Sequence, residues 1–113
     1  MEFEVKPLDS QTALVALTGR LDTVGVDQIE IKFNAAVVAP GHHALVDLSQ
    51  VSFMSSMGMR MLITAARSLQ GRHRKLVLFS AQPLVAELLD TTAIDQIIPV
   101  ASDLTAAVSV LSA

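Results

Sequence analysis

Cysteine, tryptophan and tyrosine are all absent from this sequence of 113 residues. Without a thiol, the chain can form no disulfide, perform no thiolate catalysis and hold no zinc ion through cysteine. Four phenylalanines are the only large aromatic side chains, so the stacking platforms of a single-strand nucleic-acid binder are missing. The formal net charge of −3 also has the wrong sign for a generic nucleic-acid surface. We therefore expect no thiol-based redox chemistry and no nucleic-acid partner.

Charged side chains are scarce, at 17% of the residues, whereas apolar ones make up 51%. This balance excludes a disordered chain, and the length suits one domain, which we expect to span residues 1–113. The amino terminus has no basic segment leading into an apolar run, so no signal peptide is predicted. The apolar stretches are too short, or too interrupted by Pro and Gly, to cross a bilayer. The expected protein is cytoplasmic and does not insert into a membrane.

The hydropathy pattern predicts that the chain begins with an antiparallel hairpin. Phe3 and Val5 alternate with charged residues as far as Pro7, which is typical of a half-exposed strand. Residues 12–18 are apolar on both faces and predict a more central strand that ends at Gly19. The connection between the two strands is short, so we expect them to pair antiparallel.

Helices and strands are expected to alternate after the hairpin. The predicted helices begin after Asp22 or Thr23, at about Met57, at Pro83, and after a cap at Ser102. The predicted strands are residues 44–48, 76–79 and 97–100. The fold class is therefore α/β: a sandwich with a mixed sheet, an N-terminal antiparallel hairpin and about four helices.

Motifs that would indicate an enzyme, a cofactor or a metal are missing. No glycine-rich phosphate loop occurs, and the three histidines lack the spacing of metal ligands. Asp47 lies near the end of a buried strand, as the phosphorylated aspartate of a receiver domain does, but the acids and lysine that a receiver needs elsewhere are absent. The serines are not in a hydrolase elbow, and no base lies within recognisable reach of them. We expect a binding module with no cofactor and no metal.

The most informative segment is residues 53–58, Phe-Met-Ser-Ser-Met-Gly, which joins a buried strand to a helix. Serine is a preferred N-cap, so capping alone would account for either Ser55 or Ser56. The same position would expose a serine, whose phosphate would face free amides and the positive end of the helix dipole. Arg60 and Arg67 follow on a similar helical face, where they can pair with a phosphate or an acidic partner, or remain solvated. From spacing alone, capping is the simpler interpretation.

Four methionines crowd the same part of the chain: Met54, Met57, Met59 and Met61. Methionine can fill a core or form an adaptable contact surface. Met57 and Met61 lie one helical turn apart, so part of the set is expected to pack inward. The pattern leaves open whether Met57 and Met59 are exposed.

The run from Asp47 to Met59, Asp-Leu-Ser-Gln-Val-Ser-Phe-Met-Ser-Ser-Met-Gly-Met, resembles the signature of the STAS domain. This family is named for sulphate transporters and anti-sigma factor antagonists. Residues 19–22 resemble the Gly-x-Leu-Asp that precedes the family's first helix, and residues 84–98 resemble its third helix and last strand. The resemblance covers nearly the whole chain, whose size resembles that of the free-standing bacterial antagonists.

The resemblance implies a regulatory protein that switches partners. Unphosphorylated, it would bind an anti-sigma factor that is also a serine kinase and so free a sigma factor. The kinase would end this complex by phosphorylating Ser56, with Ser55 as the second candidate, and a phosphatase would restore it. The implied partner-binding residues are Asp22, Thr23, Met54, Ser55, Ser56, Met57, Gly58, Met59 and Arg60.

Two positions depart from the family pattern. Ser55 stands where the family has an acid before the acceptor, and Met57 where a Ser or Thr follows it. The first change removes a charge and adds a second hydroxyl, and the second introduces a bulky thioether. These changes keep open an alternative, a non-switching STAS subunit of a lipid-transport ATPase or of a signalling scaffold. An enzyme, such as a serine hydrolase or phosphocarrier, is the third and least supported hypothesis.

Overall fold

A single mixed sheet organises the chain, and its strands lie side by side in the order in which they occur in the sequence. The computed structural model describes residues 1–112. β1 (Glu2–Asp9) pairs antiparallel with β2 (Thr12–Leu21). The next three strands, β3 (His43–Met54), β4 (Leu76–Phe79) and β5 (Val100–Ala101), continue the sheet in parallel. The hairpin and the parallel strands after it confirm the predicted fold class.

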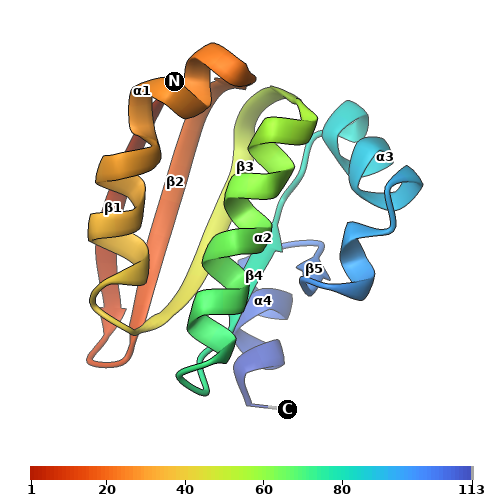
Figure 1. Cartoon of the computed structure of the whole chain (residues 1–113). Helices are drawn as coiled ribbons and strands as arrows, with labels where there is room; N and C mark the ends of the chain where they lie inside the picture. The colour runs from red at the N-terminus through yellow and green to blue at the C-terminus, as the bar shows by residue number, and fades with distance from the viewer. Residues whose placement is uncertain (113) are drawn as a thin grey trace.

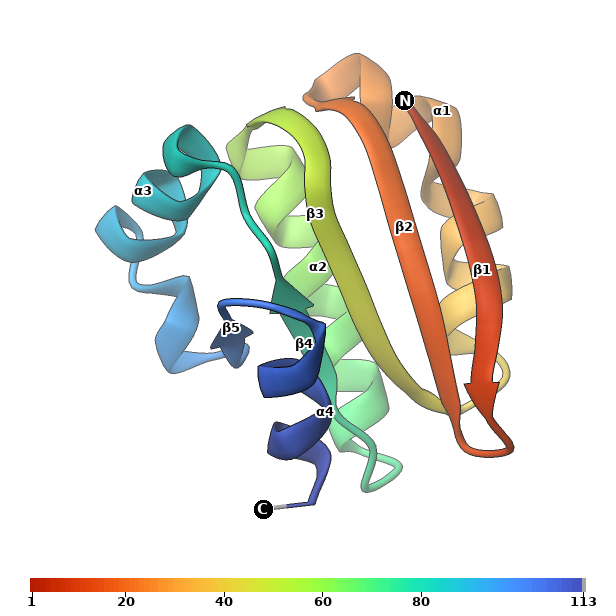
Figure 2. The same cartoon turned by 180° about the vertical axis from the view of Figure 1, so that it is seen from behind.

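Helices cover both faces of this sheet unequally. The first three, α1 (Thr23–Phe33), α2 (Ser56–Gln70) and α3 (Pro83–Thr91), lie on one face (Figure 1). Each connects neighbouring parallel strands in the same spatial direction, so right-handed crossovers place all three on one side. α4 (Leu104–Leu111) follows the last strand and packs on the opposite face, over β3, β4 and β5 (Figure 2). Two short helical turns, Asn34–Val38 after α1 and Ile94–Gln96 after α3, complete the fold.

The core is divided by the sheet into a large and a small part. Alternation along β3 sends Val46 and Leu48 towards the three-helix layer and Leu45 to the other side. The smaller part consists of Leu45, Val77, Phe79 and Ala107, which join α4 to the sheet. All four residues of β4 are buried, as expected of a parallel strand covered on both faces.

Three strands are longer than predicted, and the first of them is β2, which continues past Gly19 to Leu21. β1 continues through Pro7 to Asp9, because a proline is tolerated in an edge strand, where one side needs no hydrogen bonds. β3 continues past Leu48 to Met54, because these residues still pair with the end of β2, with register shifts along the way. Its polar residues suggest a loop, but the neighbouring strand satisfies their backbone.

The last strand and the last helix also differ from prediction. Residues 94–96 form a 3₁₀ turn, so the strand is Val100–Ala101 and not residues 97–100. The cap of α4 is Asp103 and not Ser102, since the Asp103 carboxylate accepts a hydrogen bond from the Ala106 amide at 2.8 Å. Aspartate and serine are about equally good caps, which explains why the sequence does not distinguish them.

Candidate partner-binding site

The candidate site lies where β2 and β3 end and α1 and α2 begin, at the top of Figure 1. Leu21 at the end of β2 is paired in register with Met54 at the end of β3. The residues that follow each strand therefore meet at one edge of the sheet. This arrangement brings the predicted segments around Asp22 and Ser56 together.

A side chain caps each of these two helices. The Asp22 carboxylate accepts a hydrogen bond from the Gly25 amide at 2.9 Å, and the Ser55 hydroxyl accepts one from the Gly58 amide at 3.3 Å. The Ser55 hydroxyl also donates to the Leu21 carbonyl at 3.2 Å, and the Ser55 amide donates to the same oxygen at 3.0 Å. Ser55 is therefore the capping serine, and its hydroxyl joins α2 to β2.

Arg20 links the two segments from the side. The hydrogen bond from the Gly25 amide, and then the Arg20 side chain at 3.4 Å, lower the pKa of the Asp22 carboxyl below its ordinary value. The Arg20 guanidinium also lies over the Phe53 ring, 4.6 Å from its centroid. Arg20 and Phe53 are cross-strand neighbours, a relation that depends on the register of β2 against β3. Sequence analysis did not predict this contact.

Gly58 allows the first turn of α2 to approach the end of β2 closely. A Cβ atom added at Gly58 would overlap the carbonyl oxygen and the side chain of Leu21. Gly25 stands in the same relation to the Arg20 carbonyl at the start of α1. The backbone contacts at both helix starts thus require glycine. Gly58 contributes to the site by allowing this close approach of the backbone.

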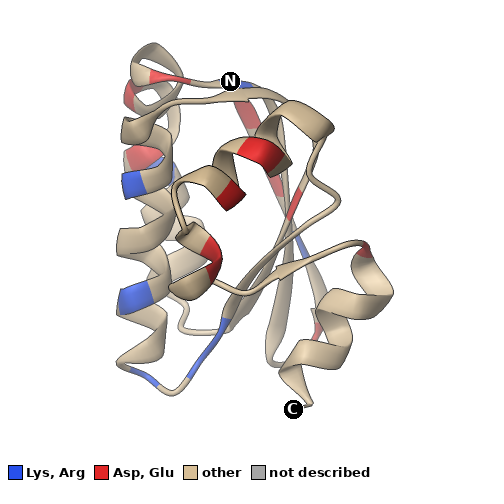
Figure 3. Cartoon of the chain, turned by 90° about the vertical axis from the view of Figure 1, so that its right-hand side faces the viewer, with Lys and Arg blue, Asp and Glu red and all other residues tan. Residues whose placement is uncertain are grey.

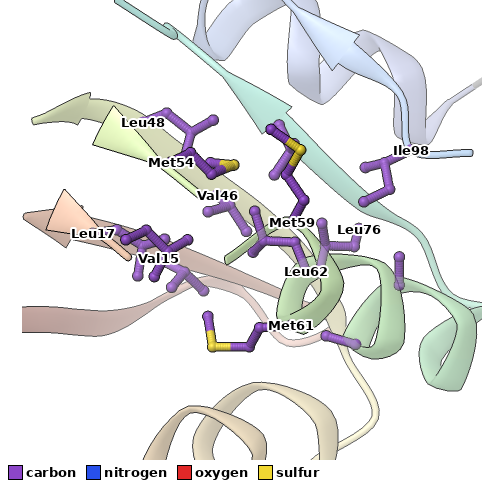
Figure 4. Packing of buried hydrophobic residues seen from close by; sticks show 14 of the residues in the cluster. Val15, Leu17, Val46, Leu48, Met54, Met59, Met61, Leu62, Leu76 and Ile98 are labelled. Atoms are coloured by element: carbon purple, nitrogen blue, oxygen red, sulfur yellow. The ribbon is translucent and has the colours of Figure 1, made fainter. Parts of the chain in front are cut away.

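The methionines separate into core and surface. Met54 and Met59 are buried, with 1% and 8% of their areas exposed, and Figure 4 shows both side chains among core residues. Both side chains therefore offer little surface to a partner. Met61 is also buried, as predicted for part of the set, whereas Met57 is 38% exposed.

The remaining predicted residues present their side chains at this edge of the molecule. Thr23, Ser56 and Arg60 are exposed, and Asp22 is half-exposed. Two exposed apolar side chains that were not predicted, Val24 and Leu84, occupy the first turns of α1 and α3. The surface around Ser56 is therefore apolar as well as polar.

Within residues 1–112, no three His, Cys, Asp or Glu side chains lie where they could hold a metal ion. The helices described for these residues include none with the length and apolar character needed to cross a membrane.

Comparison with known proteins supports this description of the fold. Residues 4–107 match the model of a family described as the STAS domain. The anti-sigma-B factor antagonist of Listeria monocytogenes is 26% identical over 100 residues, which cover 88% of each chain.

Solved structures show the same fold. An anti-sigma factor antagonist from Mycobacterium paratuberculosis superposes with a TM-score of 0.86 at 22% identity, covering 99% of this chain and 94% of that one. The antagonist SpoIIAA of Bacillus in its unphosphorylated form gives a TM-score of 0.76 at 21% identity, covering 99% and 98% of the two chains. Its phosphorylated form gives 0.70 at 21% identity, covering 96% of this chain and 99% of that one.

Proposed function

This chain belongs to the STAS domain family, and on that premise we propose that it is an anti-sigma factor antagonist regulated by phosphorylation of Ser56. In this proposal, residues 1–113 act as one cytoplasmic STAS domain that binds an anti-sigma factor with serine kinase activity. A phosphatase returns the modified protein to its binding state. The names of the related proteins support the antagonist role.

The position of Ser56 is the observation that carries the proposal. Ser56 is the first residue of α2 and its side chain is exposed. The neighbouring hydroxyl of Ser55 is half-buried, accepts from Gly58 and donates to Leu21. A kinase can reach the Ser56 hydroxyl without disturbing the fold, whereas modification of the Ser55 hydroxyl would break the cap of α2. Ser56 is therefore the preferred acceptor.

A phosphate on Ser56 changes the surface far more than the fold. It adds a charge of about −1.5 to −2 beside the free amides of the first helical turn, where the dipole favours an anion. The same charge repels acidic groups of a bound partner and must lose water if the interface stays closed. Dissociation of the complex therefore requires no large rearrangement of this chain.

The phosphorylation step is tested by intact-mass measurement after incubation with ATP and a lysate of the host. Wild type, Ser56→Ala and Ser55→Ala are treated in parallel. We expect a gain of one phosphate that is lost only in Ser56→Ala. Loss only in Ser55→Ala would move the acceptor by one residue. No gain in any sample, with active kinase confirmed in the lysate, would contradict the switch.

The binding step is tested with immobilised protein and the same lysate. We expect wild type and Ser56→Ala to retain a host protein that Ser56→Asp does not retain, and we define this protein, once identified and purified, as the switch partner. A complex that forms equally well with Ser56→Asp, and to the same extent with and without ATP, would favour the non-switching subunit. The replacement of the family's acid by Ser55 and the bulky Met57 are the observations that keep this second function under test.

A further inference from the structure

The two signs of charge are mixed over residues 1–47 but separate in the rest of the chain. Between Asp47 and Glu87 there is no acidic residue, yet this stretch holds five of the eight Lys and Arg residues. After Lys75 there is neither Lys nor Arg. Figure 3 shows the consequence in space, with Lys and Arg on α2 and acidic residues on the neighbouring α3.

Three of these five cations have a structural role at the far end of α2. Arg72 donates to the Val38 and Ala39 carbonyls at 3.0 and 3.1 Å. Arg74 donates to the Gly41 carbonyl at 3.1 Å, and Lys75 donates to the Val110 carbonyl at 3.0 Å. These side chains hold loops and α4 in place.

Arg60 and Arg67 have no such role. Both side chains are exposed, and over residues 1–112 neither forms a hydrogen bond or an ion pair. They are seven residues apart, so they lie on one face of α2 at a separation of about 10 Å along its axis. Ser56 stands one turn before Arg60 on a similar face. α2 itself contains no acidic residue that could neutralise the pair.

α1 adds an apolar line to this surface. Its core side carries Val26, Ile29 and Phe33, but Val24 and Ile31 are 65% and 86% exposed. These two residues are also seven apart and so lie on one outward face of the helix, where the exposed Asp27 and Gln28 stand between them. α1 and α2 pack side by side on the same face of the sheet (Figure 1). An apolar line and a basic line therefore run from the same edge of the molecule.

We propose that the partner docks along the outer faces of α1 and α2, and that it presents an acidic surface with apolar side chains beside it. The docking surface is defined by Val24, Ile31, Ser56, Arg60 and Arg67. It is continuous with the edge around Ser56 and extends about two helical turns beyond Arg60. The inference rests on the proposed function, because it specifies the chemistry and the orientation of the partner at that site.

This orientation also explains how one phosphate can release a partner. A phosphate on Ser56 lies at one end of the docking surface, where it repels acidic partner groups. It also competes with them for Arg60, which is one turn away on the same helix. The repulsion and the competition act in the same direction.

The test measures the affinity of the purified switch partner for two charge-reversed variants. Arg60→Glu/Arg67→Glu reverses the docking surface, and Lys6→Glu/Lys32→Glu makes an equal change of charge on β1 and at the last turn of α1. We expect the first variant to raise Kd roughly tenfold or more and the second to change it by about twofold or less. Added salt is expected to raise the Kd of the wild-type complex, because it screens the charges. The Kd of the first variant should depend much less on salt. Ile31→Ser is expected to raise Kd about threefold or more.

The outcomes separate the two proposals. Equal Kd values for the two charge-reversed variants would overturn the docking surface while leaving the Ser56 switch intact. If no host protein distinguishes wild type from Ser56→Asp, the proposed function and this inference both fall. Thermal unfolding confirms that each variant is folded, and Arg60→Gln/Arg67→Gln provides the same comparison should the reversed variant not fold.

Discussion

Gly58 is placed so that even one added methyl group has no room. Its Cα faces the Leu21 carbonyl, and the same contact brings the Ser55 cap against the end of β2. Alanine is intrinsically better than glycine inside a helix by about 1 kcal/mol, so helix propensity alone would make Gly58→Ala stabilising. The overlap with Leu21 involves a backbone oxygen, which cannot move aside as a flexible side chain can. We therefore expect the overlap to outweigh propensity.

Gly58→Ala is predicted to lower the free energy of unfolding by about 1–3 kcal/mol, the range for overpacked sites. Urea unfolding of wild type and variant measures the change. Gly71→Ala is the matched control, because Gly71 ends α2 with φ −61° and an added Cβ would meet nothing closer than 3.5 Å. There we expect no loss, or a gain of about 0.5 kcal/mol. A Gly58→Ala protein as stable as wild type would contradict the predicted overlap.

Among the elements, α2 depends most clearly on one side chain for its start. Ser55→Ala removes the acceptor for the Gly58 amide and the donor to the Leu21 carbonyl, so we expect a loss of about 1–2 kcal/mol in the free energy of unfolding. Ser55→Asp restores the cap but not the donated hydrogen bond, so its loss is expected to be smaller. The measurement is again urea unfolding. Ser52→Ala, at an exposed serine of β3, serves as control and should change stability by less than about 0.5 kcal/mol. Equal values for Ser55→Ala and Ser52→Ala would refute the role of the cap.

The order of elements could be predicted because each has a local signal. Pro83 in the first turn marks the start of α3, and the four apolar residues of β4 are typical of a strand buried on both faces. The second half of β3 has no such signal. Its pairing with β2 is a contact between residues about 33 positions apart, as for Leu21 and Met54, and no local pattern encodes it.

The same limit applies to the site. The sequence indicates that one of two adjacent serines caps α2, but the Leu21 carbonyl that holds the Ser55 hydroxyl comes from another strand. Burial of Met54 and Met59 could not be read from periodicity, because a period of two gives way to one of 3.6 between these residues. The predictable part of the site is thus its place in the chain, and the unpredictable part is which neighbouring side chain faces inward.

In the whole molecule, the two ends of the parallel strands have different roles. The carboxyl ends carry the candidate site, and the amino ends are held together by polar contacts of His43 and its neighbours. The His43 amide donates to the Gln11 carbonyl at 2.8 Å, and its Nδ1 accepts from the Lys75 amide at 3.0 Å. These bonds join the β1–β2 turn, the start of β3 and the approach to β4. A proton on Nδ1 would break the second bond.

This end of the molecule is predicted to make stability depend on pH. Partial burial, followed by the charges of Arg74 and Lys75, lowers the pKa of His43 below the ordinary value of 6.5, and Asp9 opposes this only weakly. The unfolded chain then binds more protons than the folded one as pH falls below about 6.5. Stability should therefore be complete above about pH 7, decline as pH falls through 6.5, and level off below the lowered pKa of the folded state.

Urea unfolding between pH 8 and pH 5 tests this dependence. The lowered pKa values of Asp9 and Asp22 act below this window, since they lie under the ordinary aspartate value of 3.8. His43→Gln is expected to flatten the decline of the free energy of unfolding, because the substituted side chain takes up no proton in either state. His73→Gln, at an exposed histidine in the turn after α2, should retain the decline. If the free energy of unfolding depends on pH in the same way for wild type and His43→Gln, the dependence has another origin. The hydrogen bonds of His43 would then be structural only.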